Sequence, residues 1–167
     1  MSILGIPILS LLIFFPLLGA LVLLLIDKEK PSSLRGIALL FTILEFLFSL
    51  PLFFAFHSKT GEMQFVEDLW WVPSYGISYK LGIDGISLLL VLLTTFLTVL
   101  CILSSWKAIE HRVKEFMISF LLLETGMIGA LTALDLILFY VFWEMMLVPM
   151  YLLIAIWGWI KTREYAA

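Results

Sequence analysis

The chain has 167 residues, of which 63% are hydrophobic and only 14% are charged, and its formal net charge is −3. Because soluble domains are roughly half apolar and a quarter charged, this composition excludes a soluble globular protein and indicates a protein integral to a membrane. We therefore expect the lipid bilayer as a partner. The sequence contains no basic patch of the kind that binds nucleic acid, so we expect no nucleic-acid partner.

Five long apolar runs predict five transmembrane helices. Each run has about twenty residues, which at about 1.5 Å per residue suffices to cross a bilayer core of about 30 Å. Alternating segments of about ten residues, typical of outer-membrane barrels, do not occur. We therefore expect an all-α fold, a polytopic transmembrane helical bundle that forms a single transmembrane domain over residues 1–167. The predicted spans are residues 3–26, 37–56, 86–104, 116–134 and 136–159.

The connections between these runs differ in length and character. The longest, residues 58–83, is rich in aromatic residues and turn formers, and we expect it to lie on the membrane surface, partly ordered by its aromatic rings. Asp84 and Asp135 each precede an apolar run, where a carboxylate can accept hydrogen bonds from the free amides of a first helical turn. We interpret both as helix caps near the surface.

The basic residues predict the orientation of the chain. Eight of the ten lie in the loops 27–36 and 105–115 and in the tail 161–167, whereas only Lys59 and Lys80 lie on the other side. Since basic loops stay in the cytoplasm, we expect the N-terminus outside and the C-terminus in the cytoplasm.

Three acids lie inside predicted spans: Glu45, Glu124 and Glu144. A charged side chain at mid-membrane costs roughly 2.5–3.5 kcal/mol on insertion scales, and such residues usually mark functional sites. We interpret Glu144 and Glu124 as members of a proton relay. We find no polar neighbours of Glu45 at helical spacing and favour a structural role for it.

Glu124 and Glu144 are predicted to lie at the same depth in the membrane. Glu124 is eleven residues before the Asp135 turn and Glu144 is nine residues after it. Consecutive antiparallel helices would therefore place the two acids within about 3 Å of the same level. Whether they face each other does not follow from the sequence.

Polar groups at helical spacing accompany Glu144. Tyr140 precedes it by four residues and Tyr151 follows it by seven, which predicts a polar line able to bind water along one helix face. Pro149 lacks a backbone donor, so the carbonyl of Met145 is freed next to the acid, where it could hold a water. We include Tyr140, Pro149 and Tyr151 as supporting residues of the predicted site.

Two segments carry a family resemblance. FYVFWEMMLVPMYLLI at residues 139–154 and LGIDGISLLLVLLTTFLT at residues 81–98 resemble the fifth and third helices of the antiporter-like subunit M (chain 4) of bacterial NADH-quinone oxidoreductase, respiratory complex I. The resemblance covers essentially the whole chain but only the first third of the family protein. We therefore expect a fragment or a truncated product of a larger antiporter-like subunit.

The resemblance implies a function that the residues alone do not. Family members have about fourteen helices with inverted repeats and are taken to pump protons, driven by quinone reduction in distant subunits. Glu144 corresponds to the family's central glutamate, thought to pair with a lysine on a later helix that has no counterpart here. The implied setting is the cell inner (plasma) membrane. The implied partners are the other complex I membrane subunits, and NADH, FMN, iron-sulfur clusters and quinone would be held by partner subunits. The chain itself has one cysteine and two histidines far apart in sequence, so we expect no cofactor, metal or redox site on it.

Two alternatives remain open. A subunit of a multisubunit sodium/proton antiporter would share the same architecture. A truncated membrane piece that contributes only packing or assembly surface, without transport, would also agree with the composition and the five apolar runs.

Overall fold

The computed structural model describes residues 7–158, which form five long helices and one β-hairpin. All five helices are long and apolar enough to cross a membrane. The predicted all-α, multi-pass membrane fold is therefore confirmed. The elements are α1 (Ile8–Leu25), α2 (Pro31–Ala55), β1 (Gln64–Val72), the short 3-10 turn η2 (Pro73–Tyr75), β2 (Ile77–Ile83), α3 (Gly85–Ala108), α4 (Val113–Thr132) and α5 (Leu136–Trp157).

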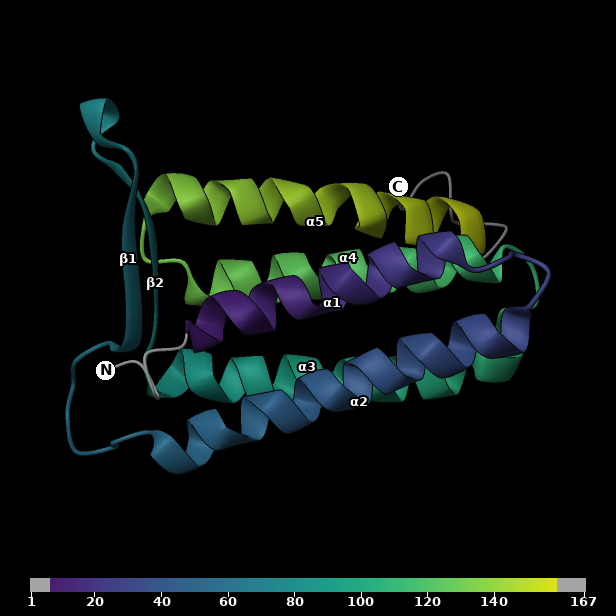
Figure 1. Cartoon of the computed structure of the whole chain (residues 1–167), viewed down its shortest axis with the longest axis horizontal. Coiled ribbons are helices and arrows are strands. Elements are labelled where there is room, and N and C mark those ends of the chain that lie inside the picture. Colours follow the sequence, from purple (N-terminus) through teal and green to yellow (C-terminus); the bar gives the residue numbers. More distant parts are fainter. Residues whose placement is uncertain (1–6, 159–167) are drawn as a thin grey trace.

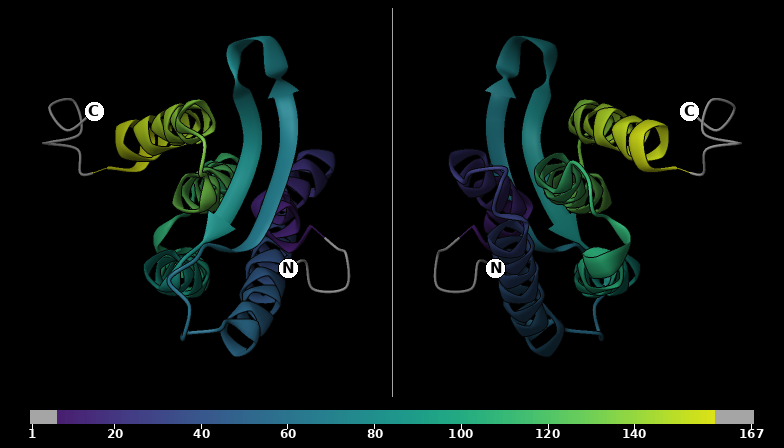
Figure 2. Two further views of the ribbon diagram at one scale, coloured as in Figure 1. Left: turned by 90° about the vertical axis from the view of Figure 1, so that its left-hand side faces the viewer. Right: turned by 90° about the vertical axis from the view of Figure 1, so that its right-hand side faces the viewer.

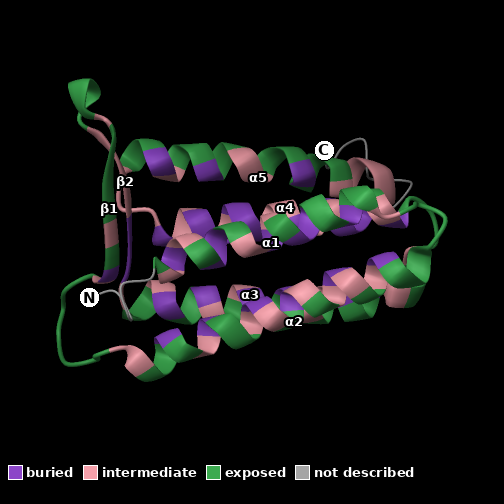
Figure 3. Cartoon of the chain, viewed as in Figure 1, coloured by how far each residue is buried: buried purple, intermediate pink, exposed green. Residues whose placement is uncertain are grey.

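The five helices lie side by side, and the hairpin crosses the end of the bundle at which α1 begins (Figure 1). Viewed along the bundle, the two strands run across the helix ends (Figure 2). α4 packs against all four other helices, whereas α5 packs mainly against α4. As a result α4 is the most buried span, with 11 of its 20 residues buried, and α5 the least, with 3 of 22. Figure 3 shows the burial of each residue along the helices.

The core consists of two apolar clusters at opposite ends of the bundle. One joins α1, the hairpin and the adjacent helix ends, and includes Leu9, Phe65 and Leu81. The other joins the opposite ends of α1 to α4 and includes Leu23, Leu34 and Met117. Many Leu and Phe side chains remain exposed on the outer helix faces, as expected where the surroundings are hydrocarbon.

The hairpin was not predicted from the sequence. The long connection contains two antiparallel strands joined through η2, and Gly76 ends that turn at φ 68°, a left-handed conformation that glycine adopts without strain. β2 then pairs with the link between α4 and α5, where Leu134 N–H donates to Lys80 O at 2.8 Å. Trp70 and Tyr75 are exposed, and the strand pairing shifts in register between Gln64 and Glu67 and between Trp70 and Val72.

Several helix ends differ from the predicted spans because apolar runs do not define helix boundaries. α2 begins at Pro31 instead of residue 37, since proline suits the first helical turn and the helix continues through polar residues. α3 extends to Ala108, beyond the predicted end at residue 104, because the helix also continues through polar residues, with Lys107 in its last turn. α4 ends at Thr132, two residues early, where Ala133 and Leu134 turn to pair with β2.

Candidate functional site

Glu144 lies on α5 with its side chain on the exposed face of the helix. Phe142 and Met146, two residues to either side, pack on Gly126 and Gly129 of α4, so close that neither glycine leaves room for a Cβ atom. Two residues correspond to about 200° around a helix, so Glu144 points away from α4. The described residues therefore offer its carboxyl no hydrogen-bond partner.

The predicted supporting residues lie beside Glu144 on α5. Tyr140 and Tyr151 are 59% and 55% exposed, so the predicted polar line runs along the outer surface of the helix. Pro149 is buried, and α5 continues through it without interruption. A groove of about 320 Å³ lies between α3, α4 and α5, but its walls are almost wholly apolar and Glu144 is not among them.

Glu124 lies at the depth predicted for it but points in the opposite direction to Glu144. It is eight residues before the end of α4 at Thr132, and Glu144 is eight residues after the start of α5 at Leu136. Glu124 is 0% exposed and lies on the far side of α4 from the glycines that contact α5. The structure thus matches the two acids in depth without bringing their carboxyl groups together.

The residue that lies close to Glu124 is Glu45 of α2. Glu45 is also 0% exposed, and its carboxyl is near enough to that of Glu124 for electrostatic interaction. The hydroxyl of Thr98 on α3 lies beside the Glu124 carboxyl. Nearby, the hydroxyls of Ser49 and Thr95 join α2 to α3 through a hydrogen bond of 3.1 Å. Three helices therefore contribute to one buried polar cluster.

The interpretation of Glu45 as a residue without polar neighbours was wrong. Thr42, three residues before it, and Ser49, four residues after it, are both fully buried on the same face of α2. That spacing was visible in the sequence and could have identified the cluster. The approach of Glu124 was not visible, because it depends on how α2 packs against α4.

The two expected helix caps are present. Asp84 Oδ1 accepts from Ser87 N–H at 2.7 Å, and Asp84 N–H donates to Ser87 Oγ at 2.8 Å, a reciprocal capping box. Asp135 Oδ1 accepts from the amides of Ile137 and Leu138 at 2.9 and 3.2 Å. In both cases hydrogen bonds to the carboxylate lower the pKa of the aspartate, with the Ser87 amide the main cause for Asp84.

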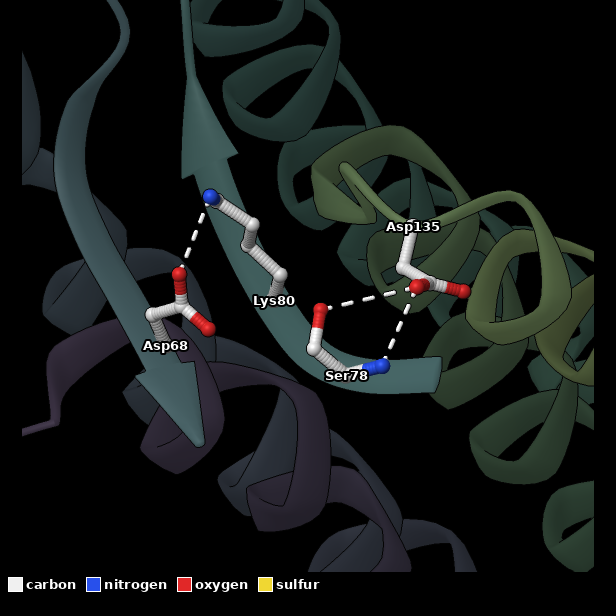
Figure 4. Close-up of polar contacts among 4 residues, drawn as sticks. All are labelled: Asp68, Ser78, Lys80 and Asp135. Atoms are coloured by element: carbon white, nitrogen blue, oxygen red, sulfur yellow. Dashed lines mark hydrogen bonds and ion pairs between the residues drawn. The ribbon is translucent and has the colours of Figure 1, made fainter. Parts of the chain in front are cut away.

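Asp135 also binds the hairpin. Its Oδ2 accepts from Ser78 N–H at 3.1 Å and from Ser78 Oγ at 3.5 Å (Figure 4), and the bond from the Ser78 amide is the largest cause of its lowered pKa. Lys80, two residues further along β2, forms an ion pair with Asp68 of β1 at 2.9 Å. One carboxylate thus caps α5 and fixes β2 to it.

On its other side the hairpin binds α1. Glu67 Oε1 accepts from Leu9 N–H at 2.8 Å and Glu67 Oε2 accepts from Ser10 N–H at 3.2 Å, and the Ser10 hydroxyl bonds to the same carboxylate. Tyr79 Oη lies 2.8 Å from Ser10 Oγ, and burial raises the pKa of the Tyr79 phenol. A helix N-terminus favours a negative charge, so Glu67 stabilises the start of α1.

Comparison with protein families gives two adjoining matches. Residues 9–134 match the family described as NADH-ubiquinone oxidoreductase chain 4, amino terminus. Residues 133–167 match the transmembrane family described as NADH:quinone oxidoreductase/Mrp antiporter. The two matches meet at the link between α4 and α5.

Individual relatives agree with these families. The chain is 50% identical over 163 residues to NADH-quinone oxidoreductase subunit M of Rhodobacter capsulatus, and 47% identical over 159 residues to NADH-ubiquinone oxidoreductase chain 4 of Arabidopsis thaliana. Each alignment covers 95% of this chain but only 31% and 32% of the relative. The chain therefore spans about a third of the length of these curated relatives.

A solved structure has a similar fold. The fold is similar to a chain of respiratory complex I from Thermus thermophilus with bound NADH, at a TM-score of 0.74 and 27% sequence identity. The match covers 95% of this chain and 31% of the other. The fold described above therefore resembles about a third of that longer chain.

Proposed function

The chain belongs to the NADH-ubiquinone oxidoreductase chain 4 family, of which it matches the amino-terminal part, and from this premise we propose that it takes part in proton translocation by NADH-quinone oxidoreductase. Glu144 is the central acid of this proposed relay, and Glu124 is a second member. NADH, FMN, iron-sulfur clusters and quinone belong to partner subunits in this proposal. This chain contributes membrane-embedded proton carriers within the inner membrane.

The observation that carries the proposal is the position of Glu144. It is the only charged residue of α5, and it lies near the middle of a helix of 22 residues. A carboxyl in apolar surroundings favours its neutral form, and an approaching cation favours the ionised form. Movement of a cation toward and away from Glu144 would therefore release and reload a proton. Tyr140, Tyr151 and water at the carbonyl freed by Pro149 would carry it further.

The exposed position of Glu144 fits this proposal only if other protein covers α5. An ionisable side chain facing hydrocarbon is unfavourable, and such residues usually face protein or a water-filled cavity. The relatives are about three times as long as this chain. We propose that a further part of the subunit packs on the outer face of α5 and supplies the cation. In the orientation that we propose from the basic loops, the hairpin lies on the outer side of the membrane.

The direct test is Glu144→Gln in the full-length subunit within the intact complex. We expect proton uptake into vesicles to be lost or strongly reduced, because the amide has the size of the acid but cannot release a proton at neutral pH. Glu115→Gln is the matched control, since Glu115 is an exposed acid at the start of α4. Undiminished proton uptake in Glu144→Gln, alongside normal NADH oxidation, would rule out the proposed role.

A sodium/proton antiporter subunit is the second candidate, because the description of the family that matches residues 133–167 also names the Mrp antiporter. The names of the curated relatives favour the oxidoreductase. Measuring proton uptake driven by NADH in sodium-free vesicles separates the two. Uptake that requires a sodium gradient and is independent of NADH would support the antiporter.

A further inference from the structure

The polar cluster around Glu45 and Glu124 is a second place at which this fold holds acids in the membrane interior. Both side chains are fully buried, and none of their four carboxyl oxygens makes a hydrogen bond of good geometry with any described residue. They come from α2 and α4, helices separated in sequence by α3. Their meeting is therefore a product of the tertiary fold rather than of local sequence.

No cation accompanies these acids within the described residues. Arg35 of α2 and Lys114 of α4 each lie ten residues along the helix from the nearer acid, about 15 Å away. Both are engaged at the helix ends, where Arg35 Nη2 donates to Ile109 O at 2.7 Å and Lys114 Nζ donates to Leu24 O and Ile26 O at 2.8 Å.

None of the other titratable groups of the five helices supplies a positive charge beside the two acids. α1 has none between Ile8 and Leu25, and Glu144 lies on α5, turned away from α4. The remaining groups are Cys101 and Lys107 on α3, Glu115 on α4, and Tyr140 and Tyr151 on α5. Two negative charges at the pair would therefore repel each other in a low dielectric without a counter-ion.

We propose that Glu45 and Glu124 form a carboxyl pair that binds an exchangeable proton between α2, α3 and α4, as a proton-binding site separate from Glu144. One bound proton leaves the pair with a single negative charge instead of two, and either carboxyl can hold it. Transfer breaks one O–H bond and forms the other, so the total charge of the pair does not change. The role of this site in pumping rests on the function proposed above, whereas its binding of a proton does not.

The hydroxyls around the pair suit this chemistry. Thr98 lies beside Glu124, and the linked Ser49 and Thr95 hydroxyls lie on the two helices that flank the cluster. Each hydroxyl already donates or can donate to a carbonyl of its own helix, as Thr98 does to Thr94 O at 2.9 Å. A hydroxyl can also turn to donate to a carboxylate, so the cluster can accommodate a change in the protonation of either acid.

The test is infrared spectroscopy of the intact complex in lipid at neutral pH, comparing the wild type with Glu45→Gln and Glu124→Gln. We expect the variants to lose absorbance of the C=O stretch of a protonated carboxylic acid, and the acid that remains in each variant to absorb at a shifted frequency. Glu115→Gln, the control, should lose only carboxylate absorbance, since Glu115 is exposed and paired with Arg112.

Three results would overturn the proposal: loss of carboxylate absorbance alone in both variants, an unshifted band for the remaining acid, or displacement of the proton band by added sodium ions. If a glutamine variant does not assemble, Thr98→Val serves in its place, because loss of the adjacent hydroxyl should shift the Glu124 band. An unchanged spectrum in Thr98→Val would count against the site.

The same variants separate this proposal from the proposed function. If Glu144→Gln pumps normally while the bands behave as expected, the relay through Glu144 is wrong and the proton site stands. If Glu144→Gln stops pumping but the bands are absent, only the carboxyl pair is wrong.

Discussion

α4 and α5 each carry one acid at the same depth in the membrane, yet the two acids have opposite surroundings. Glu124 of α4 lies in the interior among α2, α3 and α4, whereas Glu144 of α5 faces outward. The two helices differ in their neighbours: α4 contacts every other helix and α5 mainly one. Depth alone therefore does not determine the environment of an intramembrane acid, because the direction around the helix axis matters as much.

The largest effect should come from separating these two helices. Gly129→Leu should lower the free energy of unfolding by about 3 kcal/mol, because the added side chain would overlap the Phe142 ring. Denaturation in detergent would measure the change. Gly36→Ala is the control, since nothing lies within 4 Å of the position of its Cβ. An equal decrease in the free energy of unfolding in both variants would mean that disruption of the α4–α5 contact does not cause the destabilisation.

Replacing each acid by an apolar residue should distinguish the interior from the outer face. Glu124→Met should raise the free energy of unfolding by about 1–3 kcal/mol, since it removes a buried polar group without hydrogen bonds. Glu144→Met should change the stability of this part of the chain little, because its side chain is exposed here. A destabilised Glu124→Met protein would show that the carboxyl has stabilising partners, and parallel denaturation curves would measure both.

The link between α4 and α5 should give a pH-dependent effect. The Ser78 amide lowers the pKa of Asp135, so the ionised carboxylate stabilises the native state. That stabilisation is present above the pKa of Asp135 in the unfolded chain and is lost as the pH falls through the native pKa. Asp135→Asn should therefore melt at a lower temperature than the wild type at neutral pH, and the difference should shrink in acid. A difference that is constant with pH would contradict this account.

The smallest effect is expected at the exposed face of the hairpin. Lys80 and Asp68 form an ion pair, but their side chains are 42% and 45% exposed. Lys80→Ala should cost less than about 0.5 kcal/mol, because water screens such pairs. Thermal denaturation at low and high salt would show it. A larger loss would mean that the pair holds β1 and β2 together.

The sequence was sufficient to predict features that depend on one helix at a time. The apolar runs predicted the five helices, the positions of Asp84 and Asp135 predicted two caps, and counting from Asp135 predicted the common depth of Glu124 and Glu144. Features that depend on packing were not predictable. The strand pairing needs the α4–α5 link to accept β2, and the meeting of Glu45 with Glu124 needs a particular rotation of α2 against α4.

The attachment of the hairpin has a mechanical consequence. Through Glu67 it binds the start of α1, and through Ser78 and Lys80 it binds the link from which α5 begins. A piston-like shift of either helix along the membrane normal would have to drag the other with it or break these bonds. These hydrogen bonds oppose a shift of one helix alone along the membrane normal, whereas rearrangement of side chains leaves them intact. A ribbon lying outside the bilayer thus constrains how the groups inside it can move.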